Sequence, residues 1–475
     1  MTFAYQSSLM GESLASAPPE EKSETFVEAV NSVDVRATDR STRGGDVEIA
    51  GPEYRVYKRR WIGLVMLMIM NIVVSWGWLT FAPVSNLTAE WFSLSSESPV
   101  NWLSTVILFS YVVATPAVIY LLGRYSIKPA LLVAALLLLA GNWIRFAGTQ
   151  TKRFGVTMVG QILIGFSQPF FLNAPPHYSD LWFTSRGRVS ATALASLSNP
   201  FGAALGQFLD PMFANRAEKL PDMVLYVAII ASVAVLGWAV FPAHPPSPPG
   251  PSGNAEKLSA KESLEVFKRS GDFWILWAMF TVYLGLFSAF TTLLNQFMLP
   301  RGYSMDEAGI TGALLIVAGL ICSAIVSPII DRTHSYFLAI RVAVPVIAAC
   351  YLAFIWVPSG GKVAGPWAVG AILGAASFAI LPLSLELSVE FTHPVAPEWT
   401  SSLMWCGGQL LGGVLIIAMG AMKDDGNGGD MKWALVLQAV LACVAVPGAA
   451  LIGRKSTVLR RLQMDQFAYQ PVADN

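Results

Sequence analysis

Runs of about twenty apolar residues recur along the chain, separated by shorter polar segments. A bilayer core of about 30 Å is crossed by roughly 20 residues of helix, and each backbone amide must bond within the helix because lipid offers no partner. The pattern predicts an all-α membrane protein with twelve spanning helices, six on each side of a polar break. The first six are expected at Trp61–Phe81, Trp102–Leu122, Pro129–Phe146, Phe154–Phe171, Val189–Phe208 and Met223–Phe241. The second six are expected at Phe273–Phe297, Ala308–Ile330, Tyr336–Val357, Trp367–Leu387, Ser402–Met422 and Trp433–Ile452.

Polar segments divide the chain into five parts. Residues 1–52 are rich in Ser, Glu, Pro and Gly with few aromatics, which predicts a disordered cytosolic tail. Residues 244–271 begin with Pro and Gly and end with charges around Leu264 and Phe267, which indicates a cytosolic linker that ends in a surface helix. The remaining parts are an N-terminal six-helix bundle at 53–243, a C-terminal six-helix bundle at 272–453 and a C-terminal cytosolic tail at 454–475.

Composition supports this interpretation and excludes other classes. Hydrophobic residues make up 54% of the chain and charged ones 13%, which is far from the balance of a soluble protein. The 31 basic residues equal the 31 acidic ones, so charge gives no reason to expect a nucleic-acid partner. The four cysteines lie in apolar runs and are interpreted as small buried hydrophobic residues. The four histidines are scattered through loops and span ends, so we expect no metal, no cofactor and no enzyme active site.

Basic residues near the span ends predict the orientation. They cluster before the first span, in the central linker and after the last span, whereas the loop after the first span has neither Lys nor Arg. Both termini are therefore expected in the cytosol, although Arg145, Lys152 and Arg153 gather on the opposite side. The sequon at Asn86, in "NLT", would then lie on the outer side, close to a helix end where use is doubtful.

The two halves carry matching segments. The second span of each half is followed by a short basic loop, "LLGRYSIKP" at 121–129 and "IIDRTHSYF" at 329–337. Parallel repeats of six spans are common in secondary transporters, which hold their substrate between the halves. The architecture resembles the major facilitator superfamily (MFS). That resemblance implies a latch on the cytosolic side, and Asp331 and Arg332 match its pattern, with Arg124 as a candidate partner. Gly123 stands where the first-half aspartate is expected, and the alternative is that these charges only keep a short loop solvated.

Several strings narrow the resemblance. They are "YRVYKRRWIGLV", "GNWIRFAG", "TMVGQ", "TLLNQ", "IIDRTH" and "ELSVEFTHP" followed by "TSSLMW". Their order and spacing are similar to those of the feline leukaemia virus subgroup C receptor family of transporters. Members of that family are associated with choline and ethanolamine uptake, with haem export and with pyridoxine transport. The resemblance implies a transport mechanism more firmly than it implies a substrate.

The same resemblance indicates candidate substrate contacts. Trp78 matches the family tryptophan that faces the substrate, and an indole attracts an ammonium group by roughly 0.5 to 2 kcal/mol; the alternative is an interfacial belt residue. Asn295, Gln296 and Gln409 match cavity amides, which otherwise only bond neighbouring helices. Two differences from the choline-binding members argue against choline as the substrate. Pro200 follows Asn199 where choline-binding members have glutamine, and those members have an aromatic residue near Ser288, for which Tyr283 could supply a ring from an earlier turn.

Glu386 and Glu390 are four residues apart and so share one face of the tenth predicted span. Two close carboxylates would make a proton-sensitive pair. The alternative, which we favour, is that they pair with arginines such as Arg188 or Arg341 as an inner gate.

The sequence as a whole predicts a monomeric multi-pass transporter that moves a small organic solute by alternating access. The expected membrane is the plasma membrane or a vacuole- or lysosome-type membrane. A non-transporting receptor or scaffold is the alternative, but it would not need two matching halves with polar groups at mid-membrane. An intramembrane enzyme is the third class, and the scattered histidines argue against it.

Overall fold

The computed structural model describes residues 56–125, 127–183, 185–247, 260–333, 335–392, 395–424 and 429–453. The predicted tails at 1–52 and 454–475 lie outside these ranges, as do the residues between 247 and 260. The chain from Tyr54 onwards forms one compact unit. We call residues 56–247 the first half and residues 260–453 the second half.

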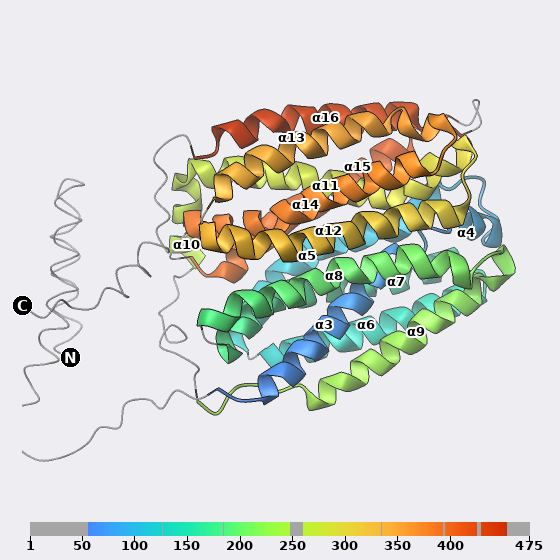
Figure 1. The fold of residues 1–475 in the computed structure, drawn as a ribbon. Coiled ribbons are helices and arrows are strands. Elements are labelled where there is room, and N and C mark those ends of the chain that lie inside the picture. Colours follow the sequence, from blue (N-terminus) through green and yellow to red (C-terminus); the bar gives the residue numbers. More distant parts are fainter. Residues whose placement is uncertain are drawn as a thin grey trace, which may run out of the picture. The chain divides into compact units, whose positions relative to one another are not determined.

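Twelve long helices account for the described part of the chain (Figure 1). The long helices of the first half are α3 (Arg59–Leu79), α5 (Ser98–Arg124), α6 (Ile127–Gln150), α7 (Phe154–Trp182), α8 (Ser185–Phe213) and α9 (Leu220–Leu236). Those of the second half are α11 (Gly271–Met298), α12 (Met305–Thr333), α13 (Tyr336–Phe354), α14 (Ala364–Thr392), α15 (Pro397–Gly420) and α16 (Lys432–Leu451). Short elements join them: α4 (Ser85–Trp91), α10 (Ala260–Arg269), η1 (Ala217–Lys219), η2 (Gly237–Val240), η4 (Leu299–Arg301) and η5 (Val357–Gly360).

Eleven of these helices, within the described residues, are long and apolar enough to cross a membrane. The exception is α8, which has 29 residues but carries several polar side chains in its buried face. Asn199, Gln207 and Asp210 are all at least 93% buried there, and they lower the hydropathy of the helix without shortening it. The fifth predicted span, Val189–Phe208, therefore exists as a helix of spanning length.

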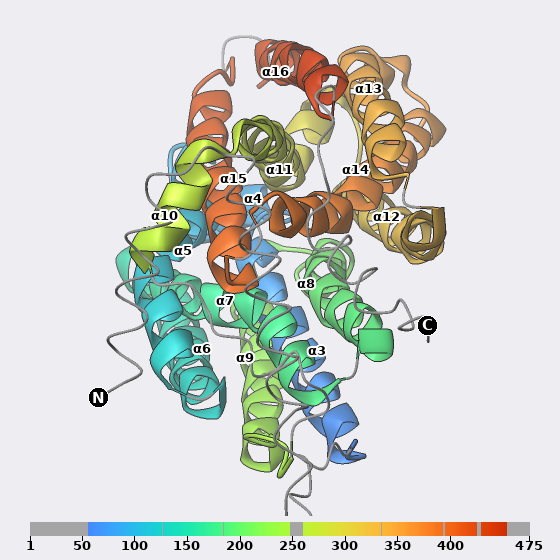
Figure 2. The ribbon, with the colours of Figure 1, turned by 90° about the vertical axis from the view of Figure 1, so that its left-hand side faces the viewer.

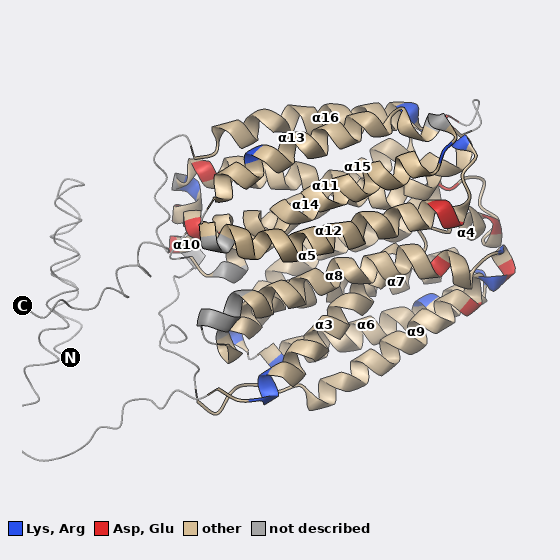
Figure 3. Ribbon diagram, in the orientation of Figure 1, with Lys and Arg blue, Asp and Glu red and all other residues tan. Residues whose placement is uncertain are grey.

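Large apolar side chains cover the outside of the bundle, as lipid contact requires. Val113, Leu236, Trp433 and Val444 are each at least 70% exposed. Cys443 is also exposed, which contradicts the expectation that every cysteine is buried. It lies on the same helix as Val444 and faces the same surroundings. Charged residues gather towards the two ends of the bundle (Figure 3).

Glycines let helices approach closely in both halves. A Cβ on Gly202 of α8 would meet the carbonyl of Ile72 on α3, and one on Gly374 of α14 would meet the carbonyl of Leu315 on α12. Gly412 of α15 lies against Ser288 of α11. In a bilayer, where burial of apolar surface gives no advantage over lipid, such close backbone packing is a main source of helix association.

We name the ends of the bundle after the short helices that lie there: the α4 end and the α10 end (Figure 1). Figure 2 looks along the bundle from the α10 end, with α3, α6, α7, α8 and α9 on one side and the second-half helices on the other. On the amphipathic α10, Phe267 is buried against Phe273 of α11, with ring centroids 5.0 Å apart, while Leu264 is exposed. The expected surface helix thus rests on the second half.

Candidate functional site

Polar side chains join the two halves at the α4 end. Gln296 Nε2 donates to Asn101 Oδ1 at 2.6 Å, and Asn295 Nδ2 donates to Ser85 Oγ at 3.2 Å. Ser85 Oγ in turn donates to Glu97 Oε2 at 2.7 Å. A cross-half ion pair completes the set, with Lys423 Nζ and Glu97 Oε1 3.1 Å apart. We call these six residues the closure network: Ser85, Glu97, Asn101, Asn295, Gln296 and Lys423.

Close helix packing continues from the closure network towards the middle of the bundle. On α15, Gly420 lies against Asn101, and Gly413 lies against Phe109 of α5. On the opposite side, Gln207 Nε2 of α8 donates to the Thr291 carbonyl of α11 at 2.7 Å. The hydrogen bonds that join described residues of the two halves all lie towards the α4 end. The structure is therefore a conformer closed at that end.

Behind this closure, α3 presents a polar face to the interior. Asn71, Ser75 and Trp78 are spaced by four and three residues, so they form one stripe on the helix. Each has a buried polar atom without a hydrogen-bond partner: Asn71 Oδ1, Ser75 Oγ and the Trp78 indole Nε1. On α7, Gln168 Oε1 and Asn173 Nδ2 are buried and unpartnered too. Because native proteins satisfy most buried polar groups, these five atoms are candidates for hydrogen bonds with a solute or water.

The predicted contact Gln409 lies on α15 of the second half. Its side chain is 4% exposed, so its amide lies within the bundle rather than on the lipid-facing surface. α15 packs against α5, which in turn packs against α7. The two predicted contacts, Trp78 on α3 and Gln409 on α15, thus lie on opposite halves of the bundle.

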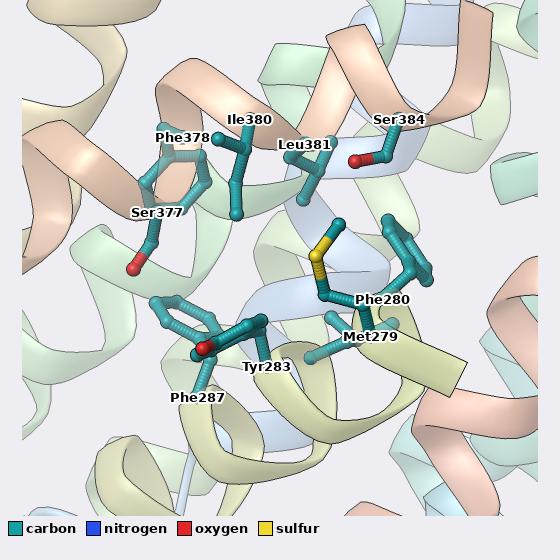
Figure 4. Close-up of a pocket in the computed structure, with 10 residues that line it drawn as sticks. Met279, Phe280, Tyr283, Phe287, Ser377, Phe378, Ile380, Leu381 and Ser384 are labelled. Atoms are coloured by element: carbon teal, nitrogen blue, oxygen red, sulfur yellow. The ribbon is translucent and has the colours of Figure 1, made fainter. Parts of the chain in front are cut away.

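A small pocket with a volume of about 40 Å³ lies between α11 and α14 in the second half (Figure 4). Its wall is mainly aromatic and aliphatic, with Phe280, Tyr283, Phe287 and Phe378 supplying the rings. Tyr283 lends only its ring, because its hydroxyl donates to the Ala442 carbonyl at 2.9 Å. Ser384 Oγ on the opposite wall is buried without a partner. The pocket is therefore small and mainly apolar, and the Ser384 hydroxyl is a hydrogen-bonding group in its wall.

The other predicted residues lie at the two ends. Asn295 and Gln296 belong to the closure network and bond to the first half in this conformer. Arg124 is exposed at the last turn of α5. Glu386 is half-buried and Glu390 is 7% exposed on α14, and each has an interaction partner. Asp331 and Arg332 fall in the last turn of α12, and their side chains lie outside the described residues.

Sequence reasoning missed the most deeply buried charges. Arg145, expected near the outer loop, is fully buried, whereas Lys152 and Arg153 are exposed. Asp210 is also fully buried, just beyond the predicted end of its span at Phe208. The available signal was the charge itself, because an ionisable residue in an apolar run is a functional candidate by default. Among the described residues, no three His, Cys, Asp or Glu side chains are grouped so as to hold a metal ion.

Comparison with known proteins agrees with this architecture. Residues 67–416 match the family model of the Major Facilitator Superfamily. "Solute carrier family 49 member A3" of Danio rerio is 27% identical over 88% of this chain and 91% of its own. "Choline/ethanolamine transporter flvcr2b" of Danio rerio is 27% identical over 88% of each chain. "Choline/ethanolamine transporter FLVCR1" of Felis catus is 26% identical over 79% of this chain and 70% of its own.

Solved transporter structures share the fold. A bacterial homologue of the lysosomal transporter Spinster, in an inward-facing conformation, superposes with a TM-score of 0.65 at 15% identity, over 84% of this chain and 98% of its own. The transporter FucP, in the outward conformation, gives a TM-score of 0.58 at 17% identity, over 84% of this chain and 100% of its own. These neighbours in different conformations support alternating access. The chain belongs to the Major Facilitator Superfamily, among relatives of the feline leukaemia virus subgroup C receptor type, and is a secondary membrane transporter rather than an enzyme.

Proposed function

We propose that the transported solute is a small organic ammonium compound of the choline and ethanolamine class. The observation that carries the proposal is that Trp78 and Gln409, on helices of opposite halves, are both buried, and that the Trp78 indole N–H has no hydrogen-bond partner. Relatives that cover most of this chain are choline/ethanolamine transporters by name. A bound solute would accept the indole N–H and would give the Gln409 amide a partner.

The chemistry of the surrounding groups fits such a solute. An indole face binds an ammonium group without a carboxylate, by roughly 0.5 to 2 kcal/mol. The free oxygens of Asn71 and Gln168 can accept a hydroxyl or a primary ammonium proton. The Tyr283 ring supplies aromatic surface from the second half. Asn295 and Gln296 become candidate solute contacts in the conformer open at the α4 end, where their amides lose their present partners.

We further propose that the α4 end faces the outside and that both termini face the cytosol, in the plasma membrane or a vacuole- or lysosome-type membrane. The conformer described is then closed outside. The opposite conformer would be held shut at the α10 end by Asp331, Arg332, Arg124, Glu386 and Glu390, whose charges stand at the cytosolic ends of the helices. The protein would act as a monomer.

Uptake by purified protein in vesicles tests the proposal. We expect saturable counterflow of labelled choline or ethanolamine, reduced at least tenfold by Trp78→Ala and about fivefold by Gln409→Ala. Trp433→Ala is the matched control, because Trp433 is 71% exposed and should leave transport unchanged. Stabilisation by choline, ethanolamine, pyridoxine or haem in a thermal-shift screen would rank the solutes, since ligand that binds only the folded state raises its stability. Stabilisation by pyridoxine or haem alone would overturn the ammonium assignment.

A further inference from the structure

Two opposite charges lie inside the first half, apart from the proposed substrate contacts. Arg145 of α6 and Asp210 of α8 are both 0% exposed. Charges inside a membrane protein are costly and rarely lack a role. We infer that Arg145 and Asp210 act as a separated charge pair that fixes the end of α3, and thereby positions Trp78 and couples it to closure at the α4 end. This inference rests on the proposed transport role of Trp78.

Arg145 acts as the cap of α3. The last carbonyls of a helix have no intrahelical partner, and a cation near them is favourable. Arg145 Nη1 donates to the Gly77 carbonyl at 3.1 Å and to Thr80 Oγ1 at 3.2 Å. Thr80 Oγ1 in turn donates to the Trp76 carbonyl at 2.9 Å, and Ser104 Oγ donates to the Trp78 carbonyl at 3.2 Å. Three successive carbonyls, those of residues 76 to 78, are thus held by side chains.

The guanidinium is itself held by neutral groups. Arg145 Nη2 donates to Asn142 Oδ1 at 2.7 Å, and Nη1 also reaches Gln161 Oε1 at 3.1 Å. Gln161 Nε2 bonds to the Leu103 carbonyl of α5 at 3.0 Å. The Phe81 ring lies 5.7 Å from the guanidinium carbon. The arginine is therefore fixed by α3, α5, α6 and α7 together.

Asp210 holds the other side of the same turn. Its Oδ1 accepts the Trp76 indole N–H at 2.9 Å, while Oδ2 is buried without a partner. Gly206, one turn earlier on α8, brings the helix against Trp76, since a Cβ there would lie 3.1 Å from the indole Cδ1. Trp76 is two residues from Trp78, so a shift of α8 moves the end of α3 and the substrate tryptophan with it.

The two charges compensate each other at a distance. They interact electrostatically, but no Arg145 nitrogen lies within 4.0 Å of an Asp210 oxygen. Each is bonded to neutral partners from α3 instead. Removal of one charge therefore leaves the other buried and uncompensated, which costs more than removal of both.

The same turn of α8 also contacts the second half. Gln207, three residues before Asp210, bonds to the Thr291 carbonyl and lies against Gly309 and Gly312 of α12. Beyond Thr80, α3 leads through a short turn into α4, which begins at Ser85 of the closure network. When the halves separate at the α4 end, the bond between Gln207 and the Thr291 carbonyl is lost, and any resulting shift of this turn of α8 is passed to Trp76 through its bond to Asp210.

Neutralising variants test the inference. Asp210→Asn keeps the acceptor for Trp76 but removes the charge, and Arg145→Gln removes the opposite charge. Closure is measured without any solute, by cross-linking an Asn101→Cys/Gln296→Cys pair with a short bifunctional thiol reagent in a background lacking the four native cysteines. We expect each single variant to lower the cross-linking rate at least threefold, and Arg145→Gln/Asp210→Asn to recover to within about twofold of the parent. Arg153→Gln, an exposed charge at the same end, should have no effect.

Trp76→Phe supplies a variant that keeps both charges. It should raise the KM for choline in counterflow about threefold with little change in the amount of folded protein, whereas a merely structural role would lower protein yield and leave KM unchanged. A double variant as impaired as the sum of the singles, or unchanged cross-linking in Asp210→Asn, would overturn the charge pair. Absence of choline transport in the parent would instead refute the proposed substrate, because the cross-linking result stands without it.

Discussion

The first half of the bundle holds its polar groups in a directional network, whereas the second half is held together mainly by apolar packing. In the first half, Arg145 and Gln161 bond to four helices around the end of α3. In the second half, the interior between α11 and α14 is a pocket walled by phenylalanines, with a few hydroxyls. Directional bonds fix a geometry, and apolar contacts tolerate sliding. The difference teaches that two halves with the same helix order can be held together in different ways, by directional hydrogen bonds in the first half and by apolar contacts around the α11–α14 pocket in the second.

Backbone packing through glycine is what the two halves share, and its disruption should have the largest effect. In Gly202→Ala and Gly374→Ala the new methyl group meets a backbone carbonyl of the neighbouring helix, which cannot move aside. We expect each variant to lose about 3 kcal/mol of stability, the upper end for overpacking, and most of its folded yield. Size-exclusion profiles and Tm in detergent measure this.

Each half offers its own glycine control. Gly155 at the start of α7 and Gly271 at the start of α11 have open space where a Cβ would lie. Alanine at either position should be neutral or slightly stabilising, because it reduces the freedom of the unfolded chain. If only one of the two variants, Gly202→Ala or Gly374→Ala, lost stability, the halves would not share this mode of packing.

The polar network should make the first half more sensitive to loss of one amide. Gln161→Leu removes bonds to Arg145, to the Gly77 carbonyl and to the Leu103 carbonyl, and we expect a cost of about 2 kcal/mol. Gln438→Leu in α16 removes one bond, to the Leu286 carbonyl, and also removes a buried amide oxygen that has no partner, so we expect a cost of about 1 kcal/mol or less. Thermal unfolding of the two variants compares them directly. Equal losses would contradict the contrast between the halves.

Most of the helices could be predicted from the apolar runs of the sequence, whereas the arrangement of the candidate site could not. The first predicted span, Trp61–Phe81, lies two residues from the observed helix Arg59–Leu79, because hydrophobic length alone determines a span. The same use of apolar length ended the fifth predicted span at Phe208 and so left out Asp210. A charged residue next to an apolar run is interpreted as the end of a span when its partner in the folded bundle is unknown. Arg145 was included in the third predicted span, Pro129–Phe146, but was grouped with Lys152 and Arg153 at its outer end. Which buried polar groups meet depends on helix rotation, and no linear pattern records that rotation.

The last prediction concerns the ion pair that joins the two halves, and its expected effect on closure is small. Glu97 and Lys423 form an ion pair across the halves, with both side chains 16% exposed, and Glu97 also accepts from Ser85. Partial burial makes such a pair worth more than an exposed one, so we expect Lys423→Ala to weaken closure by about 1 kcal/mol, a roughly fivefold slower cross-linking of the Asn101→Cys/Gln296→Cys pair. The pair of Lys219 and Asp222 is the control, because both residues are in the first half and about half exposed, and its loss should leave closure unchanged.

Raising the salt concentration from about 0.1 M to 1 M should shrink the Lys423 effect, since it shortens the Debye length from about 10 Å to 3 Å. An effect that persists unchanged in high salt would mean that Lys423 acts through packing of its alkyl stem rather than through its charge.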